Sequence, residues 1–446
     1  MSYWLDGSGK TVGVLGLGRS GRAAAALLSR RGFAVVGIDD SPDCPPCPDC
    51  RRHVLGDTKA LDLEELDGLV LSPGVPPAAQ LPSRARELGI PVTGEVELAS
   101  LFTSATVAAV TGSNGKTTTV EWLGHLLRKA GLNACVAGNM GYPFSRAVLE
   151  RPDAGVYVLE VSSYQLETIR TFRPKVAAVL NLTPDHLSRH GDMDGYRGAK
   201  ARIFMNQSPE DFLVLNADDP QLVSLIGLTE GMEMYFSLRR PVETGAFVRE
   251  GSLQLAWAGG VSPLLPVEEL SLPGAHNTAN ALAVASIARA LGVSGQRMLE
   301  GLRTFPGVPH RLEEVRRLGG VRYVNDSKST NIDSLRVALE AEPGPLVLIA
   351  GGRPKEGDYG GLREAVRSRA RAVLTIGEAA GMLAEAWSDG ITVERLPDLD
   401  AAVGRARSLA RSGDTVLLSP GCASFDQYEN FEERGDHFRR LVEALS

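Results

Sequence analysis

The chain contains little cysteine and no long apolar run, and each of these shortages excludes a class of protein. Five cysteines in 446 residues are too few for a disulfide scaffold. No uncharged apolar stretch reaches about 18 residues, so we expect no transmembrane helix and no insertion into a membrane. The first ten residues lack a basic segment followed by an apolar run, so a secretory signal is not expected either. Together these features indicate a reducing cytoplasm.

Positive charge is not in excess. Lysine and arginine number 47 against 54 aspartates and glutamates, which gives a formal net charge of −7. A chain of this mild acidity lacks the electrostatic footprint of a nucleic-acid-binding protein, so we expect no nucleic-acid partner.

Apolar residues make up 43% of the chain and charged residues 23%, which argues against disorder. Glycine is abundant, at 49 residues, and is typical of turns and of backbone that closely approaches ligands.

Apolar strand patterns alternate with helical patterns along the chain, and this order predicts parallel βαβ units. At roughly 150 residues per domain, the length suggests three domains. We therefore expect an α/β protein with domains at 1–98, 99–305 and 306–446. The expected strands lie near 11–18, 33–39, 66–74, 106–110, 156–162, 176–182, 211–219, 321–324, 345–352, 372–377 and 414–421, and the clearest helices near 22–32, 119–131 and 279–292.

A first glycine motif lies between an expected strand and an expected helix. Gly16, Gly18 and Gly21 form the pattern G-x-G-x-x-G, and Asp39 ends the next strand about 20 residues further on. Such glycines let a backbone turn approach a pyrophosphate at the N-terminus of a helix. On its own the motif favours NAD, but another diphosphate nucleotide, or a tight turn without a ligand, also fits.

A second glycine motif, TGSNGKTT at 111–118, also lies between a strand and a helix. A standard P-loop has glycine at the position of Val110, so the nearer Gly112 makes this a shortened variant. Its backbone N–H groups can surround phosphates, while Lys116 reaches the β- and γ-oxygens and the Thr117 hydroxyl holds Mg²⁺. The pattern predicts an ATP site that needs a metal ion, and a glycine turn without a ligand is the alternative.

Polar residues follow several expected strands of the middle domain. Glu160, His186 and Lys200 are the candidates, because ligands gather at the carboxyl ends of parallel strands. Each residue also has an ordinary structural interpretation. These are a surface or capping carboxylate, a hydrogen-bonding imidazole and a solvated ammonium, respectively. Their order along the chain favours a shared site.

Two polar runs in the third domain follow expected strands, at 325–331 and 419–427. Polar clusters commonly form plain loops, but His310 and Arg311 just upstream place an arginine near the domain junction. Asp326 could accept ribose hydroxyls. The second run combines glycine with small polar residues, which suits anion capture.

Cys44, Cys47 and Cys50 form the pattern C-x₂-C-x₂-C in a proline-rich loop. Three thiolates could bind zinc with a fourth ligand such as His53, although this spacing is a weaker signal than two separate C-x-x-C pairs. The prolines also explain the segment as a stiff projecting loop. Zinc is therefore the less favoured interpretation.

Taken together, the motifs resemble those of the Mur ligase family over nearly the whole chain, from Gly16 to about Phe438. One motif could match by chance, but the whole series in this order could not. The resemblance implies an N-terminal Rossmann-like domain for a UDP substrate, a central P-loop ATPase domain and a C-terminal Rossmann-like domain. It also explains the first glycine motif without NAD. The motifs are TGSNGKTT (111–118), GNMG (138–141), LEVSSYQLE (159–167), TPDH (183–186), YRGAKARIF (196–204), GAHNTANALA (274–283), PHRLE (309–313), NDSKSTN (325–331) and SPGCASFDQYENFEERG (419–435).

The resemblance also implies a role for residues in each domain. The catalytic group is Lys116, Glu160, His186 and Lys200. The implied ATP contacts are Gly112, Asn114, Gly115, Lys116, Thr117, Thr118, Asn277, Asn280, Arg311 and Asp326. The implied contacts to the UDP substrate are Gly18, Arg19, Ser20, Asp39, Ser72, Gly74, Asn139 and His186. Two magnesium ions would be held by Thr117, Glu160, His186 and Lys200, the last as a carbamate made from CO₂. The incoming amino acid would meet Lys328, Thr330, Lys355, Ser424 and Phe431.

The sequence departs from the family pattern in two places. Glu356 follows Lys355 where the family usually has glycine, and the loop 44–50 has no family role that we can name. The acidic Glu356 would stand beside a site that otherwise carries cationic and hydroxyl donors.

The implied reaction is ATP-dependent amide formation by a monomeric enzyme. The carboxylate of UDP-N-acetylmuramoyl-L-alanine would attack the γ-phosphate, and the amine of D-glutamate would then displace phosphate from the acyl phosphate.

One alternative is a ligase that adds a diamino acid or polyglutamate. Another is an NAD-dependent dehydrogenase, which leaves 111–118 and 325–331 unexplained. A third is a nucleotide-binding regulator without turnover, against which the joint presence of Glu160, His186 and Lys200 argues.

Overall fold

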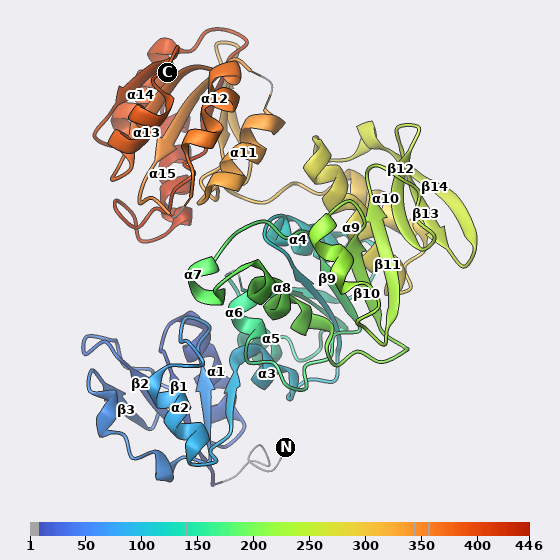
Figure 1. Ribbon diagram of the computed structural model, residues 1–446, viewed down its shortest axis with the longest axis vertical. Coiled ribbons are helices and arrows are strands. Elements are labelled where there is room, and N and C mark those ends of the chain that lie inside the picture. Colours follow the sequence, from blue (N-terminus) through green and yellow to red (C-terminus); the bar gives the residue numbers. More distant parts are fainter. Residues whose placement is uncertain (1–8, 140, 343, 356) are drawn as a thin grey trace. The chain divides into compact units, whose positions relative to one another are not determined.

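The computed structural model describes residues 9–139, 141–342, 344–355 and 357–446. In this described part the chain forms three sheets, of five, nine and six strands, which follow one another along the sequence (Figure 1). Residues up to Ser271 together with Asn277–Phe305 make one compact unit, which holds the first two sheets. Leu272–His276 together with Pro306–Ser446 make a second unit, which holds the third sheet. The α/β class expected from the sequence is confirmed.

The first sheet is parallel throughout and has the order β3-β2-β1-β4-β5. Its central strands β1 and β4 are almost wholly apolar and buried, as strands of a parallel sheet covered on both faces must be. The short strand β3 is absent from the expected strands, because its sequence RHVL has no continuous apolar run. The elements are β1 (Thr11–Leu15), α1 (Arg19–Arg30), β2 (Ala34–Asp39), β3 (Arg52–Leu55), β4 (Gly68–Leu71), α2 (Gln80–Glu87), β5 (Val92–Gly94) and α3 (Glu95–Ser100).

The second sheet has the order β14-β13-β12-β11-β10-β9-β6-β8-β7. Its strands are parallel from β7 to β12, whereas β12, β13 and β14 form an antiparallel meander that the sequence does not predict. The edge strand β14 contains proline and is largely exposed, so it lacks the apolar run of a central strand. The elements are β6 (Thr106–Thr111), α4 (Lys116–Lys129), β7 (Ala134–Gly138), α5 (Phe144–Glu150), β8 (Val156–Glu160), α6 (Ser163–Leu166), β9 (Val176–Val179), α7 (Leu187–His190), α8 (Met193–Ala201), β10 (Phe212–Asn216), β11 (Met232–Ser237), β12 (Gly245–Arg249), β13 (Ser252–Trp257), β14 (Gly260–Pro266), α9 (Ala275–Ala290) and α10 (Gly295–Arg303).

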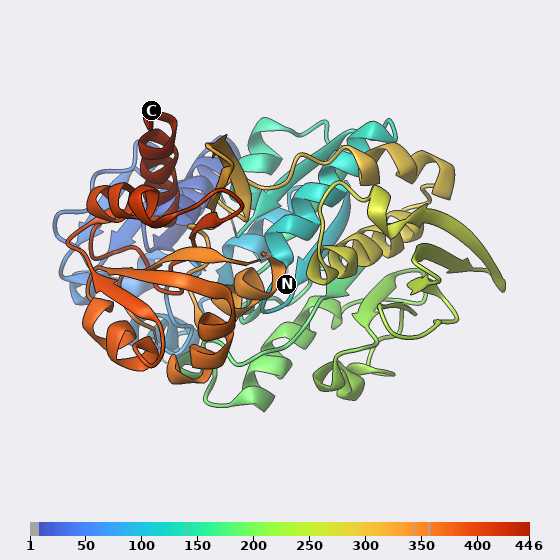
Figure 2. The same cartoon turned by 90° about the horizontal axis from the view of Figure 1, so that it is seen from above.

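The third sheet has the order β15-β16-β20-β17-β18-β19, and only β15 in it is antiparallel to its neighbour. Helices α11, α12 and α13 pack on one face and α14 and α15 on the other, which makes a three-layer arrangement (Figures 1 and 2). The elements are β15 (Glu313–Leu318), β16 (Val321–Asn325), α11 (Ile332–Ala341), β17 (Leu346–Gly351), α12 (Arg363–Arg369), β18 (Ala370–Ile376), α13 (Ala380–Trp387), β19 (Thr392–Arg395), α14 (Leu399–Leu409), β20 (Thr415–Leu418) and α15 (Phe431–Glu443).

The two glycine motifs follow strands at which the sheet order changes direction. β1 lies between β2 and β4, and β6 lies between β8 and β9. In open α/β sheets, ligands bind in the crevice outside the carboxyl ends of strands at such positions. The fold therefore places both glycine motifs where ligand sites are expected.

Two properties of the described residues relate to the classes of protein that the sequence argues against, namely membrane-spanning proteins and disulfide scaffolds. None of their helices combines the length and apolar character that crossing a membrane requires. The five cysteines, Cys44, Cys47, Cys50, Cys135 and Cys422, all have free thiols.

Candidate active site

The loop after β6 is shaped by two glycines with positive φ angles. Gly112 has φ 150° and Gly115 has φ 82°, a region in which residues with a Cβ are strained. A Cβ on Gly115 would lie 2.6 Å from Asn280 Oδ1, so close packing also requires glycine there. The loop is further fixed by Asn114, whose backbone N–H donates to Asn181 Oδ1 at 2.8 Å. A preformed backbone of this kind is what a phosphate-binding loop needs.

Lys116 and Thr117 begin α4, directly after this loop. Lys116 Nζ donates to the carbonyl oxygens of Gly112 and Ser113, each at 2.8 Å, so its ammonium lies over the loop. Thr117 Oγ1 donates to Glu160 Oε2 at 2.6 Å, and Asn139 Nδ2 donates to Glu160 Oε1 at 3.0 Å. Glu160, the last residue of β8, therefore joins two other predicted site residues. Hydroxyl and carboxylate oxygens are the ligands that Mg²⁺ prefers.

Lys200 reaches the same loop from α8, although only 1% of its surface is exposed. Its Nζ donates to Gly112 O at 2.9 Å and to Thr111 Oγ1 at 3.3 Å, and lies 4.6 Å from the centre of the Tyr196 ring. Burial, together with the nearby charge of Lys116, lowers the pKa of Lys200 well below its usual range. The shift increases the fraction of neutral amine at neutral pH, and the solvated-ammonium interpretation of this residue is wrong.

His186 lies in the segment between β9 and α7. Its Nδ1 is 3.0 Å from the hydroxyl of Tyr164, which belongs to the helix that follows Glu160, and its Nε2 is 3.5 Å from Asp185 Oδ2. Among the described residues, no group of three or more His, Cys, Asp or Glu side chains is arranged to hold a metal ion.

Six of the eight predicted contacts to the UDP substrate lie at the carboxyl ends of β1, β2 and β4, whereas Asn139 and His186 follow the strands β7 and β9 of the second sheet. Leu17 N donates to Asp39 Oδ2 at 2.7 Å and Ser41 N donates to Asp39 Oδ1 at 3.0 Å, so this carboxylate fixes the glycine turn. A Cβ on Gly21 would lie 1.9 Å from Gly16 O, which explains the closely spaced glycines. The remaining members are Gly18 and Arg19, which are exposed at the start of α1, with Ser20, Ser72 and Gly74.

The loop with three cysteines lies between β2 and β3 and is held by hydrogen bonds of the protein itself. Cys47 N donates to His53 Nε2 at 2.9 Å, so one ring nitrogen of His53, the residue considered as a fourth zinc ligand, accepts a backbone N–H here. Arg22, from α1, donates to the carbonyl oxygens of Pro45 and Pro46. These contacts attach the loop to the helix that follows the first glycine motif.

The predicted ATP-binding residues are divided between the two units. Asn277 and Asn280 lie in α9 within the first unit, whereas Arg311 and Asp326 belong to the second. Asp326 Oδ2 accepts from Ser419 Oγ at 2.8 Å, and burial raises the pKa of Asp326 to about 6 although Arg311 opposes the shift. Arg311 Nε is buried without a hydrogen-bond partner among the described residues. This nitrogen is a donor that a ligand could satisfy.

The predicted amino-acid site draws residues from three strand ends of the third sheet. Lys328 Nζ lies 5.2 Å from the centre of the Phe431 ring, and Ser327 Oγ donates to Phe431 O at 2.8 Å. Ser424 is buried, with 2% of its surface exposed, while Lys355 is exposed. Thr330 lies two residues after Lys328, and Glu356 lies outside the described residues.

Arg434 connects these strand ends and is a residue that sequence reasoning missed. Its side chain is 1% exposed and donates to Ser327 Oγ at 3.0 Å and to the carbonyl oxygens of Ser327 and Cys422. Burial lowers the pKa of Arg434 to about 10. Arg434 lies inside the motif at 419–435, but nothing in its local pattern FEERG distinguishes a buried arginine from a solvated one.

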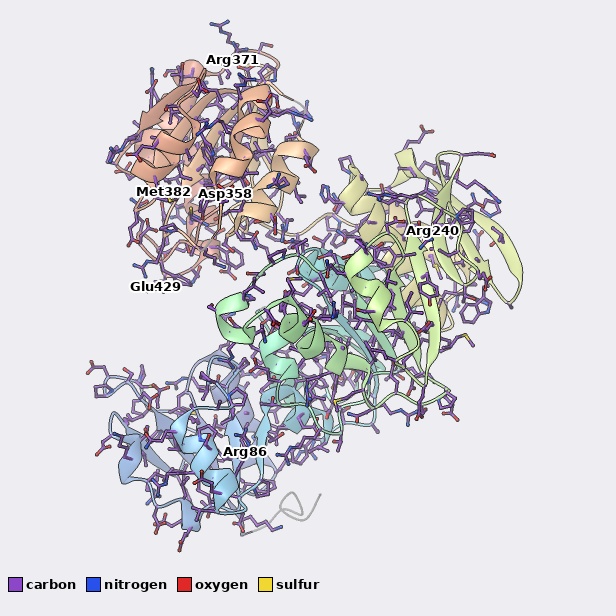
Figure 3. The ribbon with its side chains drawn as sticks, in the orientation of Figure 1. Arg86, Arg240, Asp358, Arg371, Met382 and Glu429 are labelled. Carbon is purple, nitrogen blue, oxygen red and sulfur yellow. The ribbon has the colours of Figure 1, made fainter. Side chains whose placement is uncertain are left out.

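The opposite end of the third sheet is held by an ion pair. Arg371, at the start of β18, lies at the end of this unit away from Glu429 (Figure 3). Arg371 donates through Nε and Nη2 to the buried Asp414, at 2.8 and 3.0 Å. The predicted site residues of this unit therefore lie at the carboxyl end of the third sheet. The ion pair at the amino end of the sheet has a structural role.

These features define a class of protein: an α/β protein with a preformed glycine loop, of the kind that binds phosphate, at the switch point of its central sheet. Comparison with known families gives a narrower result. Residues 110–288 match the Mur ligase middle domain, and residues 310–422 match the Mur ligase, glutamate ligase domain.

Proteins with established names match this chain over almost its entire length. The UDP-N-acetylmuramoylalanine–D-glutamate ligase of Pelotomaculum thermopropionicum is 44% identical over 99% of both chains. The enzyme of the same name from Myxococcus xanthus is 44% identical over 98% of this chain and 99% of its own. The chain belongs to the Mur ligase family.

Solved structures of the family share the fold at low sequence identity. The UDP-N-acetylmuramate-alanine ligase of Thermotoga maritima superposes with a TM-score of 0.63 at 20% identity, covering 98% of this chain and 99% of its own. A pseudomurein peptide ligase of Methanothermus fervidus gives 0.64 at 19% identity, covering 98% of this chain and 100% of its own. The three-domain architecture expected from the sequence is confirmed at the level of fold.

Proposed function

We propose that the protein is an ATP-dependent ligase that joins D-glutamate to UDP-N-acetylmuramoyl-L-alanine. The observation that carries the proposal is the 44% identity, over nearly both whole chains, to enzymes named UDP-N-acetylmuramoylalanine–D-glutamate ligase. The contacts of Lys116, Thr117, Glu160 and Lys200 around one glycine loop support it independently. They provide the phosphate-binding and charge-stabilising groups that such a ligase needs.

The central loop is proposed to bind the phosphates of ATP. Its N–H groups and Lys116 would hold the γ-phosphate in place and stabilise charge as the phosphoryl group moves. Thr117 and Glu160 fit a magnesium ion, because their oxygens already lie 2.6 Å apart. His186 and a carbamylated Lys200 would hold a second ion. When bound, magnesium neutralises charge on the phosphates and polarises the bond that is broken.

The chemistry follows from the poor reactivity of a carboxylate. Its negative charge repels nucleophiles, and oxide is a bad leaving group. Attack of a carboxylate oxygen on the γ-phosphorus releases ADP and leaves an acyl phosphate, whose carbonyl carbon the D-glutamate amine then attacks. Phosphate leaves with the bridging oxygen and the amine loses a proton. No protein nucleophile takes part, so positioning and electrostatic stabilisation supply the catalysis.

The acyl-phosphate route makes an isotopic prediction. If both carboxylate oxygens of the acceptor are labelled with ¹⁸O, one label is expected in the released phosphate and one in the amide product. Mass spectrometry of both products measures the distribution, and reactions without D-glutamate or without the acceptor are the controls. Retention of both labels on the muramoyl side would contradict the intermediate. Absence of phosphate release in the complete mixture would instead favour a nucleotide-binding regulator.

Carbamylation of Lys200 is a second prediction. A neutral amine attacks CO₂, and the burial that depresses the pKa of Lys200 favours this form. In ¹³C-bicarbonate, the protein is expected to show a carbamate carbon signal that Lys200→Ala abolishes. Lys129→Ala, which removes an exposed lysine of α4, should keep the signal. A wild-type protein without the signal when substrates and Mg²⁺ are bound would refute the modification.

A further inference from the structure

Tyr164 and His186 contact each other through their polar atoms. The Tyr164 hydroxyl is 3.0 Å from His186 Nδ1, and the ring centroids are 4.9 Å apart. The other ring nitrogen, Nε2, is 3.5 Å from Asp185 Oδ2. The two nitrogens of the imidazole therefore face different groups, a phenol on one side and a carboxylate on the other.

The phenol is held in place by the protein on two further sides. Tyr164 lies in α6, which begins with a capping box formed by Ser162 and Gln165. The guanidinium of Arg189 lies 4.8 Å from the centre of the Tyr164 ring. Arg189 is itself fixed by Glu167, to which Nε and Nη2 donate at 3.1 and 2.6 Å. The position of the hydroxyl is thus set without any ligand.

The backbone of His186 is fixed in an uncommon conformation. Its φ of 55° and ψ of 28° fall in the left-handed region, which residues other than glycine seldom adopt. Its carbonyl oxygen accepts the N–H groups of Arg189 and His190 in the short helix that follows. The direction of the Cα–Cβ bond of His186 is therefore fixed. What remains is rotation of the ring about the Cβ–Cγ bond, which exchanges Nδ1 with Cδ2 and Nε2 with Cε1 and which the Tyr164 hydroxyl opposes by holding Nδ1.

We propose that Tyr164 is a positioning residue for His186: its hydroxyl holds Nδ1, so that Nε2 is the nitrogen presented beside Asp185 to the bound substrate and metal ion. The inference rests on the proposed ligase function, in which His186 has those contacts. A hydrogen bond at one ring nitrogen commonly sets the orientation and tautomer of a histidine that binds through the other. The substitution Tyr164→Phe would keep the packing of the ring and remove the hydroxyl that holds the His186 imidazole.

The nitrogen shifts of the free protein test this role without any ligand. With ¹⁵N-labelled histidine, the side-chain signals of the seven histidines can be recorded, and the spectrum of His186→Asn assigns His186. The wild type is expected to show His186 in one dominant tautomer, and Tyr164→Phe to show a shifted, averaged pair of nitrogens. Tyr235→Phe removes a hydroxyl that bonds Glu233 in β11, and it should leave the His186 signals unchanged. Unchanged His186 shifts in Tyr164→Phe would overturn the proposal.

Kinetics provide a second readout. In Tyr164→Phe the KM for the UDP substrate, or the Mg²⁺ concentration at half-maximal rate, is expected to rise about tenfold, while the KM for D-glutamate stays constant. An equal loss across all substrates, with an unfolding temperature below that of the wild type, would show a merely structural role and overturn the proposal. Lack of ligase activity in the wild type would overturn the proposed function instead, since the nitrogen shifts do not depend on turnover.

Discussion

Phosphate release is expected to be rapid with D-glutamate and slower by a factor of about 10⁴ with amino acids that lack the side-chain carboxylate. A site built to bind two carboxylates leaves its donors unpaired when one of them is missing, and unpaired buried donors cost more than a lost contact. Initial rates with D-glutamate, L-glutamate, L-lysine and meso-diaminopimelate at equal concentration measure the selectivity, and L-lysine is the member of this set that lacks the side-chain carboxylate.

The expected selectivity comes from donors that the third sheet places at its carboxyl end. Lys328 lies beside the Phe431 ring, and Ser424 is buried close to the segment that Arg434 fixes. A basic side chain would need an acidic partner, and none is among the proposed amino-acid contacts Lys328, Thr330, Lys355, Ser424 and Phe431, although Glu356 follows Lys355 in the sequence. L-glutamate is expected to fail for a different reason, because inversion at the α-carbon moves its amine away from the acyl phosphate.

Variants of the same site separate amino-acid binding from ATP binding. Ser424→Ala and Lys355→Ala are expected to raise the KM for D-glutamate far more than the KM for ATP. Arg367→Ala, which removes an exposed ion pair on α12, is the matched control and should change neither value. The reverse pattern would show that the amino-acid site lies elsewhere. Preference for either diamino acid would overturn the specificity and leave the ligase chemistry standing.

The parts of the fold that the sequence predicts are those with strong local signals. β1, β6 and β17 are continuous apolar runs that end in glycine or a polar loop. Their hydrophobic pattern and the residues that end them therefore identify them as strands. β3 and β14 have no such runs, because they lie at sheet edges and are largely exposed or half-buried, and β12 and β13 are mostly buried but have only short apolar stretches that polar residues bound or interrupt. Their pairing depends on neighbouring strands, and a single-sequence pattern does not contain that information.

The candidate site shows the same division between local and long-range information. The shortened P-loop can be identified from 111–118, because its glycines and lysine are adjacent in sequence. The hydrogen bond from Thr117 to Glu160 joins residues that are 43 positions apart in the sequence, and the one from Lys200 to Gly112 joins residues 88 positions apart. No rule of residue spacing predicts contacts over such separations. The resemblance to the family grouped these residues, and the fold supplies the physical reason: α4, β8 and α8 converge on one loop.

The burial of Lys200 could not be anticipated from its sequence. Nothing in YRGAKARIF distinguishes Lys200 from a solvated lysine, yet α8 turns this lysine inward against Tyr196 and the loop. Long side chains usually keep their charged end in water, so a lysine with 1% exposure marks a site where the charge is altered or used. Tertiary packing, rather than helix propensity, decides the chemistry of this residue.

Removal of the phosphate-loop lysine is expected to abolish turnover. Lys116→Ala should lower kcat by a factor of about 10³ or more, because the ammonium is proposed to stabilise charge that develops on the transferring phosphoryl group. In the structure Lys116 Nζ donates to two carbonyl oxygens of the loop, Gly112 O and Ser113 O, each at 2.8 Å. The glycine angles and the bond from Asn114 to Asn181 also hold this loop, so the variant should remain folded.

Lys129→Ala is the matched control for that experiment. Lys129 belongs to the same helix, α4, but lies at its last turn, where it forms an exposed ion pair with Glu300. Its removal takes away the same charge and should leave kcat within about twofold, since exposed pairs contribute little. Circular dichroism and calorimetric titration with the UDP substrate establish that both variants keep the fold and the first-domain site. Turnover of Lys116→Ala at the wild-type rate would contradict the assignment of this loop to ATP, because no other cation of the loop segment 111–118 could replace it.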